Sequence, residues 1–262
     1  MKVAVIGPGR LGEALLSGML RAGLAPTDAA VVVRRAERGE ELAHAHGVQV
    51  LTALAAAEFA DVLLITVKPQ DVEAAVAELA PAATLPLVVS AAAGVPTSFF
   101  EKRLADGTAV VRVMTNTPVL VDEAMTVASP GAHASGEDIE RTRSLFAAVG
   151  KFMVLPEYQQ DAVTALSGSG PAYFFYLVEA MTDAGILLGL PRAVAADLLV
   201  QTALGAAVML RDSGEHPVQL RESVTSPAGT TISAIRELEN HGVRAALPVS
   251  YTHLTLPTNR EV

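Results

Sequence analysis

The first twelve residues constrain the fold of this chain more than any other stretch. An apolar run, Val3–Ile6, leads into the spacing Gly7-x-Gly9-x-x-Gly12, and a helical apolar period follows from Glu13. In a βαβ unit such glycines form the turn, admit a pyrophosphate to the backbone and let the helix pack on the strand. The pyrophosphate then lies at the helix N-terminus. The candidate dinucleotide-binding loop is therefore Gly7-Pro8-Gly9-Arg10-Leu11-Gly12, although a plain βα turn without a ligand shares the pattern.

Further apolar runs recur along the first part of the chain and alternate with segments of helical period. Runs this continuous are typical of a parallel sheet that is covered on both faces. The predicted strands are Ala30–Val33, Val48–Leu51, Asp61–Val67, Leu87–Ala91, Ala109–Met114, Met125–Ala128 and Lys151–Leu155. The predicted helices between them are Glu37–His46, Asp71–Ala80, Phe99–Ala105 and Ser135–Val149. We therefore expect an α/β fold in which residues 1–157 form a Rossmann-type dinucleotide-binding domain.

The second predicted strand ends in two arginines. An acidic residue about 20 residues past the glycines would bind the ribose hydroxyls of NAD, whereas arginine suits the 2′-phosphate of NADP. Arg34 and Arg35 therefore predict NADPH as the cofactor, with NADH as a second possibility. The alternative is a solvated pair that simply begins the next helix.

Short polar or small-residue segments follow the carboxyl ends of three other predicted strands. Ligands of open α/β sheets bind at this edge, so these segments are candidate cofactor contacts. A lysine in such a loop is also commonly just solvated, and that alternative applies to Lys68. The candidates are Thr66, Val67, Lys68 and Pro69 at the end of the fourth strand and directly after it, Ala91, Ala92 and Ala93 at the end of the fifth and directly after it, and Asn116 after the sixth.

After the last predicted strand the alternation ends and only helices are predicted. The chain is helical from Gln159, breaks around Ser167–Gly170 and resumes in two long helices, Pro171–Leu188 and Arg192–Asp212. Both long helices are apolar on nearly every face, which predicts burial in a bundle or in a subunit interface. We expect residues 158–247 to form an all-α dimerisation domain of an obligate homodimer, from which a higher oligomer can be built.

Composition and charge argue against several classes of protein. The net charge of −9 disfavours nucleic acid as a partner, and without cysteine there are no disulfides or thiolate sites. The six histidines show no metal-ligand spacing, so no metal site is predicted. The start of the chain lacks the pattern of a signal peptide. Because Arg192, Asp197 and Gln201 interrupt the most apolar region, Ala184–Leu210, no membrane span is predicted and we expect a cytoplasmic protein.

Three motifs together resemble pyrroline-5-carboxylate reductase, the family that makes L-proline. They are the opening glycine motif, Leu166-Ser-Gly-Ser-Gly-Pro-Ala-Tyr173 and Thr225-Ser-Pro-Ala-Gly-Thr-Thr231, and the last is the most specific. Val67-Lys68-Pro69, Ala91–Gly94 and Arg112–Asn116 are also similar, so the resemblance covers residues 1–246. One departure is Thr115, where the family usually has proline. We expect a looser turn there, beside an asparagine that the resemblance places on the nicotinamide side.

The resemblance implies hydride transfer from a nicotinamide to the C=N carbon of a cyclic imine that carries a carboxylate. The segment before the predicted helix Ile232–Glu239 is rich in glycine and hydroxyls, and such a helix N-terminus is a good carboxylate site. A simple N-cap without a ligand is the alternative. The implied substrate-binding residues are Ser226, Gly229, Thr230, Thr231 and Glu157, with the Thr231 hydroxyl as the catalytic group that bonds the imine nitrogen.

A β-hydroxyacid dehydrogenase and an imine reductase for other substrates would share the glycine loop and a helical second domain, and a non-catalytic NADP-binding sensor is a third alternative. A β-hydroxyacid dehydrogenase would carry a catalytic lysine in the helix that opens its second domain, but residues 159–188 contain no lysine. An imine reductase for other substrates and a non-catalytic NADP-binding sensor remain open.

The last residues, 248–262, do not fit the rest of the chain. They contain two prolines and many β-branched residues, with no helical period. The family continues here with an amphipathic helix, so we interpret this stretch as an atypical tail that is not native to the fold.

Overall fold

The computed structural model describes residues 1–252, with side chains described through Val249, and the chain divides into two compact units. The first unit extends to Pro171, beyond the sequence-based boundary near Glu157. Buried Gln160 explains part of this extension, because its Nε2 donates to the carbonyl of Val127 at 3.2 Å and to Ser129 Oγ at 2.8 Å. The start of the helical region is thus hydrogen-bonded to the sheet.

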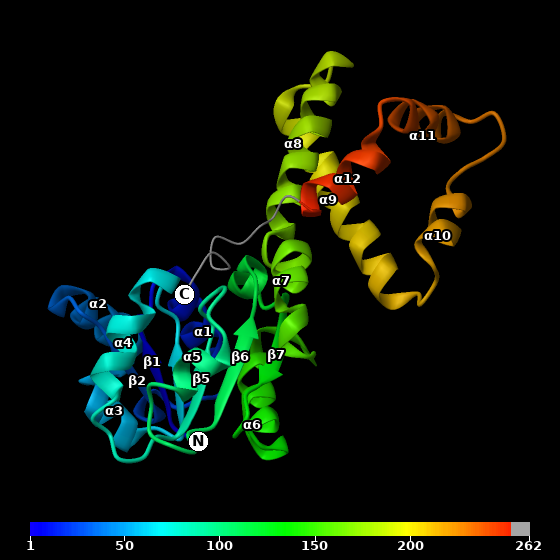
Figure 1. Cartoon of the computed structure of the whole chain (residues 1–262). Helices are drawn as coiled ribbons and strands as arrows, with labels where there is room; N and C mark the ends of the chain where they lie inside the picture. Colours follow the sequence, from blue (N-terminus) through cyan, green and yellow to red (C-terminus); the bar gives the residue numbers. More distant parts are fainter. Residues whose placement is uncertain (253–262) are drawn as a thin grey trace. The chain divides into compact units, whose positions relative to one another are not determined.

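The first unit is built on a single sheet of eight strands (Figure 1). The strand order is β3-β2-β1-β4-β5-β6-β7-β8, which is the reversing order of a dinucleotide-binding fold. The strands are β1 (Val3–Ile6), β2 (Ala29–Val32), β3 (Gln49–Val50), β4 (Val62–Ile65), β5 (Leu87–Ser90), β6 (Val110–Met114), β7 (Ala124–Pro130) and β8 (Gly150–Val154). Each predicted strand is present, with ends shifted by a few residues at most.

The pair β6–β7 departs from the parallel arrangement. It is antiparallel, with Val113 opposite Ala128, whereas β8 returns parallel to β7. Only the 3₁₀ turn Thr117–Val121 lies between β6 and β7. A parallel crossover needs a connection of about a dozen residues or more, usually with a helix, so this short connection reverses the chain instead.

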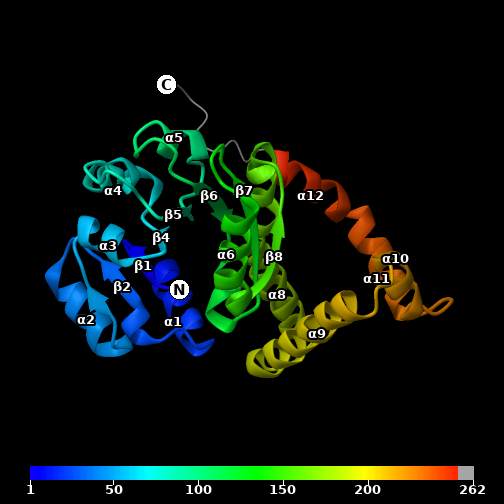
Figure 2. The ribbon, with the colours of Figure 1, turned by 90° about the horizontal axis from the view of Figure 1, so that it is seen from below.

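Helices cover both faces of the sheet, as Figure 2 shows from below. Alternate residues of β1 point to opposite sides, so that Val3 and Val5 belong to one apolar core and Ala4 and Ile6 to the other. The first core is covered by α1 (Arg10–Arg21), α2 (Ala36–His46) and α6 (Gly136–Phe146), and the second by α3 (Ala53–Phe59), α4 (Val72–Leu79) and α5 (Thr97–Glu101).

Helix α3 was not predicted from the sequence, although its signal is present. Thr52 Oγ1 accepts a hydrogen bond from the Ala55 amide at 3.3 Å, and an alanine-rich run follows this N-cap. Alanine has the highest helix propensity, so the cap and the run together specify a short helix.

The helical region begins inside the first unit with α7 (Gln160–Val163) and a π-helical turn at Thr164–Gly168. This turn is the break that the sequence predicted around Ser167–Gly170. The remaining helices are α8 (Gly170–Leu187), α9 (Arg192–Asp212), α10 (Pro217–Ser223), α11 (Thr230–Asn240) and α12 (Val243–Thr252), of which α10 and α12 were not predicted.

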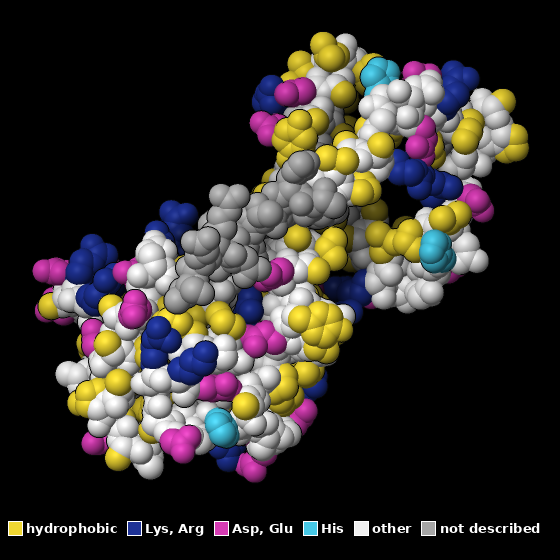
Figure 3. Space-filling view, in the orientation of Figure 1, with side chains coloured by type: hydrophobic (Ala, Val, Ile, Leu, Met, Phe, Trp, Pro, Cys, Tyr) yellow, Lys and Arg dark blue, Asp and Glu magenta, His cyan; other side chains and the backbone are white. Residues whose placement is uncertain are grey.

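Helices α8 and α9 leave much of their apolar surface exposed within one chain. Figure 3 shows hydrophobic side chains gathered along the helices of the second unit. The exposed residues include Phe174, Phe175, Leu198, Val200 and Leu204. By length and composition alone α9 could also cross a membrane. The polar residues in this helix therefore do not by themselves exclude a membrane span, contrary to the interpretation of the sequence.

The prediction that residues 248–262 form a non-helical tail is wrong for residues 248–252. Residues 248–252 continue α12, with Pro248 inside the helix. The preceding Val243–Leu247 has already formed the first turns, and Pro248 removes one backbone donor without ending the helix. The rest of the predicted tail, 253–262, lies outside the described residues.

Candidate active site

The three glycines of the first turn have three distinct surroundings. Gly7 has φ +68° and lies against the Val67 side chain, so a side chain at this position would be strained and would collide. A Cβ at Gly12 would collide with Thr66 Oγ1, because helix α1 packs closely on the end of β4. A Cβ at Gly9 would meet nothing within 4 Å, and Gly9 lines an open cavity. The space beside Gly9 is therefore left free for a ligand, as a bound dinucleotide requires.

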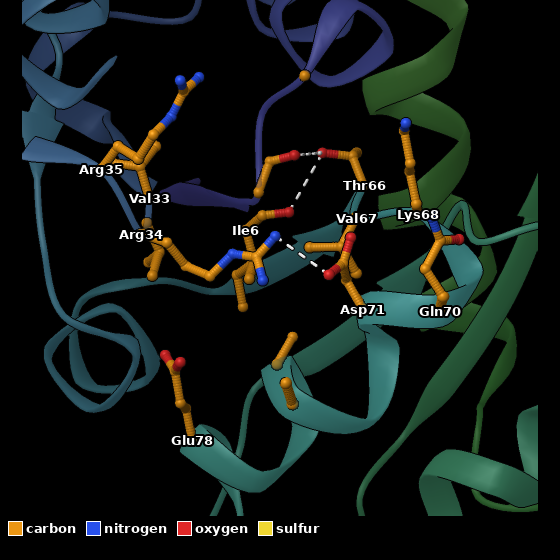
Figure 4. Close-up of a pocket in the computed structure, with 15 residues that line it drawn as sticks. Ile6, Val33, Arg34, Arg35, Thr66, Val67, Lys68, Gln70, Asp71 and Glu78 are labelled. Atoms are coloured by element: carbon orange, nitrogen blue, oxygen red, sulfur yellow. Dashed lines mark hydrogen bonds and ion pairs between the residues drawn. The ribbon is translucent and has the colours of Figure 1, made fainter. Parts of the chain in front are cut away.

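This cavity has a volume of about 430 Å³ and lies at the carboxyl ends of β1, β2 and β4 (Figure 4). A second cavity of about 360 Å³ adjoins it and adds Pro8 and Arg38 to the lining. Thr66 links the strand ends that line the cavity, since its hydroxyl donates to the carbonyls of Ile6 and Gly7 at 3.2 Å each. The structure thus brings together the following predicted cofactor residues: Gly7, Pro8, Gly9, Arg34, Arg35, Thr66, Val67 and Lys68.

The basic end of the cavity contains residues that the sequence argument missed. Arg34 Nη2 lies 3.1 Å from Asp71 Oδ1, and Figure 4 shows the two side chains pointing toward each other. Asp71 directly precedes α4, whereas Arg34 follows β2. Because the two residues are far apart in the sequence, their ion pair could not be predicted from it. Arg38 lies in the first turn of α2, which starts directly after Arg34 and Arg35, and this nearness in the sequence was the available signal.

Other predicted cofactor residues lie outside the cavity lining. Arg10 and Leu11 belong to the first turn of α1, and Pro69 begins a 3₁₀ turn after Lys68. Ala91, Ala92 and Ala93 follow β5, where the amide of Ala91 donates to the Ile65 carbonyl at 2.9 Å. Their contacts with a cofactor stay a prediction.

Asn116 is fixed at the end of β6 by hydrogen bonds on both sides of its amide. Its Oδ1 accepts from the Met125 amide at 3.0 Å, and its Nδ2 donates to Ser167 O at 3.1 Å and Ser167 Oγ at 3.3 Å. The buried hydroxyls of Thr115 and Thr126 are joined at 2.9 Å, which ties the end of β6 to β7. The expectation that this turn is looser than one with proline stays a prediction.

Glu157 has partners inside the first unit. Its Oε1 accepts from the Thr97 amide at 2.8 Å and lies 3.5 Å from Arg112 Nη1, while its Oε2 accepts from Thr97 Oγ1 at 2.9 Å. Arg112 is buried in β6 and also lies 3.7 Å from Asp161. The carboxylate thus stabilises the start of α5 and neutralises a buried arginine. Contact with substrate stays a prediction.

The second unit presents a helix N-terminus with unoccupied donors. Helix α11 begins after Gly229, which has no side-chain cap, and the first amides of any helix lack intrahelical partners. The Gly229 amide donates to Ser226 O at 3.1 Å across Pro227 and Ala228, whose φ is +56°. This tight turn is a strained conformation for alanine, and such strain concentrates at functional sites.

The threonines at the start of α11 do not cap it. In the described part of the chain, neither the Thr230 nor the Thr231 hydroxyl has a hydrogen-bond partner, because Gly229 takes the N-cap position. The capping alternative for Thr231 is thus disfavoured. The site combines free hydroxyls with free amides, which suits a carboxylate ligand.

Comparisons with known proteins agree with this arrangement. Residues 157–252 match the family described as pyrroline-5-carboxylate reductase dimerisation, and residues 2–94 match NADP oxidoreductase coenzyme F420-dependent. The pyrroline-5-carboxylate reductase of Corynebacterium melassecola is 43% identical over 249 residues, or 93% of this chain and 92% of the relative.

Two solved structures extend the comparison. The pyrroline-5-carboxylate reductase of Coxiella burnetii has a TM-score of 0.89 and 33% identity, and the match covers 96% of this chain and 94% of that one. The Plasmodium falciparum pyrroline carboxylate reductase, solved with NADP bound, has a TM-score of 0.86 at 24% identity, with the same two coverages of 96% and 94%. At that identity the second likeness supports the fold alone.

A glycine turn beside an open basic cavity, at the edge of a parallel sheet, is typical of nucleotide-dependent oxidoreductases. The first unit accordingly is an NADP-binding domain of Rossmann type. The chain belongs to the pyrroline-5-carboxylate reductase family, and it reduces 1-pyrroline-5-carboxylate to L-proline with NAD(P)H in the last step of proline biosynthesis. The predicted fold class and activity are confirmed, and the dimerisation domain makes the protein a homodimer.

Proposed function

We propose that this reductase binds NADPH in preference to NADH and binds the imine carboxylate at the start of α11. The observation that carries the carboxylate site is the uncapped N-terminus at Gly229, where two threonine hydroxyls have no hydrogen-bond partner among the described residues. The cavity around Gly9 fits the cofactor, because no protein atom occupies the space beside this glycine and a pyrophosphate can approach its backbone there. When bound, NADPH supplies the hydride.

The residues of this chain then have separate tasks. The Thr230 amide at the start of α11 binds the carboxylate, while the Gly229 amide donates to Ser226 O and closes the turn before it. Thr231 Oγ donates a hydrogen bond to the ring nitrogen and holds it as negative charge develops there. Such a donor, aimed at a changing charge and fixed in advance, stabilises the transition state more than the ground state.

The proposal extends to the compartment and the oligomeric state of the protein, as expected for the pyrroline-5-carboxylate reductase family. The protein acts in the cytoplasm, and its dimers can build a higher oligomer through remaining apolar surface of α8 and α9. The higher oligomer is supported by the extent of exposed apolar side chains, while the net charge of −9 bears only on solubility in water.

The experiment is an assay of NADPH oxidation with pyrroline-5-carboxylate, in which proline is identified as the product. A β-hydroxy acid with NADP, and an imine without a carboxylate, serve as alternative substrates. Turnover that depends on the carboxylate is expected. Binding of NADPH without turnover would instead favour the sensor, and equal rates with the imine that lacks a carboxylate would contradict the role of α11.

A further inference from the structure

Three guanidinium groups meet at the end of the cavity beside β2, and their surroundings differ. Arg34 is paired with Asp71, and its side chain is 72% exposed. Arg35 has no ion pair in the described part of the chain, and Figure 4 shows it extending away from Arg34. Arg38 is the most enclosed of the three, with a side chain only 25% exposed. A fixed guanidinium loses less conformational entropy on binding an anion than a mobile one does.

Arg38 is held in place by carboxylates from two helices. Its Nη2 lies 2.5 Å from Glu13 Oε2, in the first turn of α1, and its Nη1 lies 3.0 Å from Glu41 Oε2 in α2. The other oxygen of Glu13 lies 3.2 Å from His46 Nε2. Arg38 therefore links α2 to the helix that follows the glycine turn.

The same contacts leave Arg38 able to bind a ligand. A guanidinium carries more N–H groups than two carboxylate contacts use, so donors remain for the cavity that Arg38 lines with Gly9 and Arg35. Glu13 stays ionised, because its hydrogen bond with Arg38 holds the pKa of this carboxyl below its usual range. Without Arg38, an ionised carboxylate would stand close to the cavity with histidine as its only remaining partner among the described residues.

We propose that Arg38 is a specificity-determining residue for NADPH, which donates to the ribose 2′-phosphate and at the same time neutralises Glu13. This inference rests on the proposed NADPH preference and deepens it. A free Glu13 carboxylate beside this end of the cavity would repel a phosphate. Arg38 thus adds an attractive contact for the 2′-phosphate and masks a carboxylate that would repel it.

The test measures binding directly, apart from activity. Isothermal titration of adenosine 2′,5′-bisphosphate and of AMP is carried out on the full chain, on Arg38→Met, on Glu13→Gln and on the double variant. Arg141→Met is the matched control, since Arg141 forms a similar 2.5 Å pair with Glu137 on α6 but does not line the cavity. Melting curves establish that each variant is folded.

Arg38→Met is expected to weaken the bisphosphate on the order of 10- to 100-fold, as loss of a charge-assisted contact requires, and to leave AMP nearly unchanged. The double variant should regain part of this loss, because Glu13 is then neutral. Glu13→Gln and Arg141→Met should each keep the preference for the bisphosphate.

Equal weakening of both nucleotides by Arg38→Met, or no weakening of either, would overturn the proposal, as would a double variant no better than Arg38→Met. If Arg38→Met does not fold, Arg38→Lys retains the charge but loses the planar donor pair and should still lower the ratio. Failure of the proposed reaction would appear separately, as absence of turnover in the unaltered enzyme.

Discussion

Thr231 stands just inside α11 with a hydroxyl that binds nothing else in the described chain. Replacing it by Ala should lower kcat on the order of 10²-fold or more, because a preorganised donor to a developing charge contributes about 2–4 kcal/mol. NADPH binding should persist, since the nucleotide cavity is lined by residues of the first unit. Steady-state kinetics and a nucleotide titration measure the two effects.

Thr231→Ser is the matched control for this prediction. It should restore much of the activity, because serine keeps the hydroxyl and loses only a methyl group. A capping role would instead cost about 1 kcal/mol of stability with kcat intact. Near-normal kcat in Thr231→Ala would contradict the catalytic assignment.

Arg34 and Arg35 carry the second prediction at this scale. Replacing both by Ala should lower kcat/KM for NADPH on the order of 10- to 100-fold and change NADH little, because only the 2′-phosphate loses charge-assisted contacts. The ion pair between Arg34 and Asp71 is largely exposed, so its loss should affect stability by less than about 1 kcal/mol. An unchanged ratio of NADPH to NADH kinetics would show that the pair is merely solvated.

At the scale of elements, Asn116 joins the end of β6 to β7 and to the π-helical turn Thr164–Gly168. Asn116→Ala leaves the Met125 amide and Ser167 without this partner, and because both are only partly buried the cost should lie at the lower end of the about 1–3 kcal/mol of an unsatisfied buried group. A loss of that size is expected in urea unfolding. Asn116→Asp should retain the bond to the Met125 amide and lose only the donor to Ser167, so it should lie between Asn116→Ala and the unaltered protein.

The same elements show how the turn tolerates threonine at position 115. The Thr115 hydroxyl is buried against Thr126, and a proline there would remove that bond while fixing the backbone by another route. If Asn116→Ala unfolded like the unaltered chain, the β6–β7 ladder and the threonine pair would suffice to hold this turn, and the hydrogen bonds of Asn116 would contribute nothing measurable.

At the scale of the whole molecule, the apolar surfaces of α8 and α9 require a partner. Leu204 is exposed within a single chain, and large exposed apolar patches mark interfaces. The dimerisation domain supplies that partner as a second copy of the chain. It also gives a reason, other than a membrane, for the length and apolar character of α9.

Leu204→Glu should therefore shift the protein from dimer toward monomer, since a carboxylate in an apolar interface loses its hydration without a partner. Light scattering after size exclusion measures the mass. Leu54→Glu is the matched control, because Leu54 is also an exposed leucine but lies on α3 of the first unit. A stable dimer in Leu204→Glu would place the interface elsewhere, and loss of the dimer in both variants would indicate general destabilisation.

The sequence by itself determined the class of fold, the order of its strands along the chain and the position of the glycine turn. These features depend on local signals, namely apolar runs, glycine spacing and helix period, which neighbouring residues carry together. The motif around Thr231 is likewise recognisable in the sequence alone, because its residues are contiguous. Helices α3 and α10 had local signals too, in the Thr52 cap and in Pro217 at a first-turn position, so they could have been predicted.

Only the tertiary structure decided which side chains meet. Glu157 pairs with Thr97, Arg38 with Glu13, and Asn116 with Ser167, and each pair joins segments far apart in the sequence. The partners of a charged or polar side chain depend on how distant elements pack, and no local pattern encodes that packing. For the same reason the antiparallel pairing of β7 with β6 and the extension of the first unit to Pro171 are visible only in the tertiary structure.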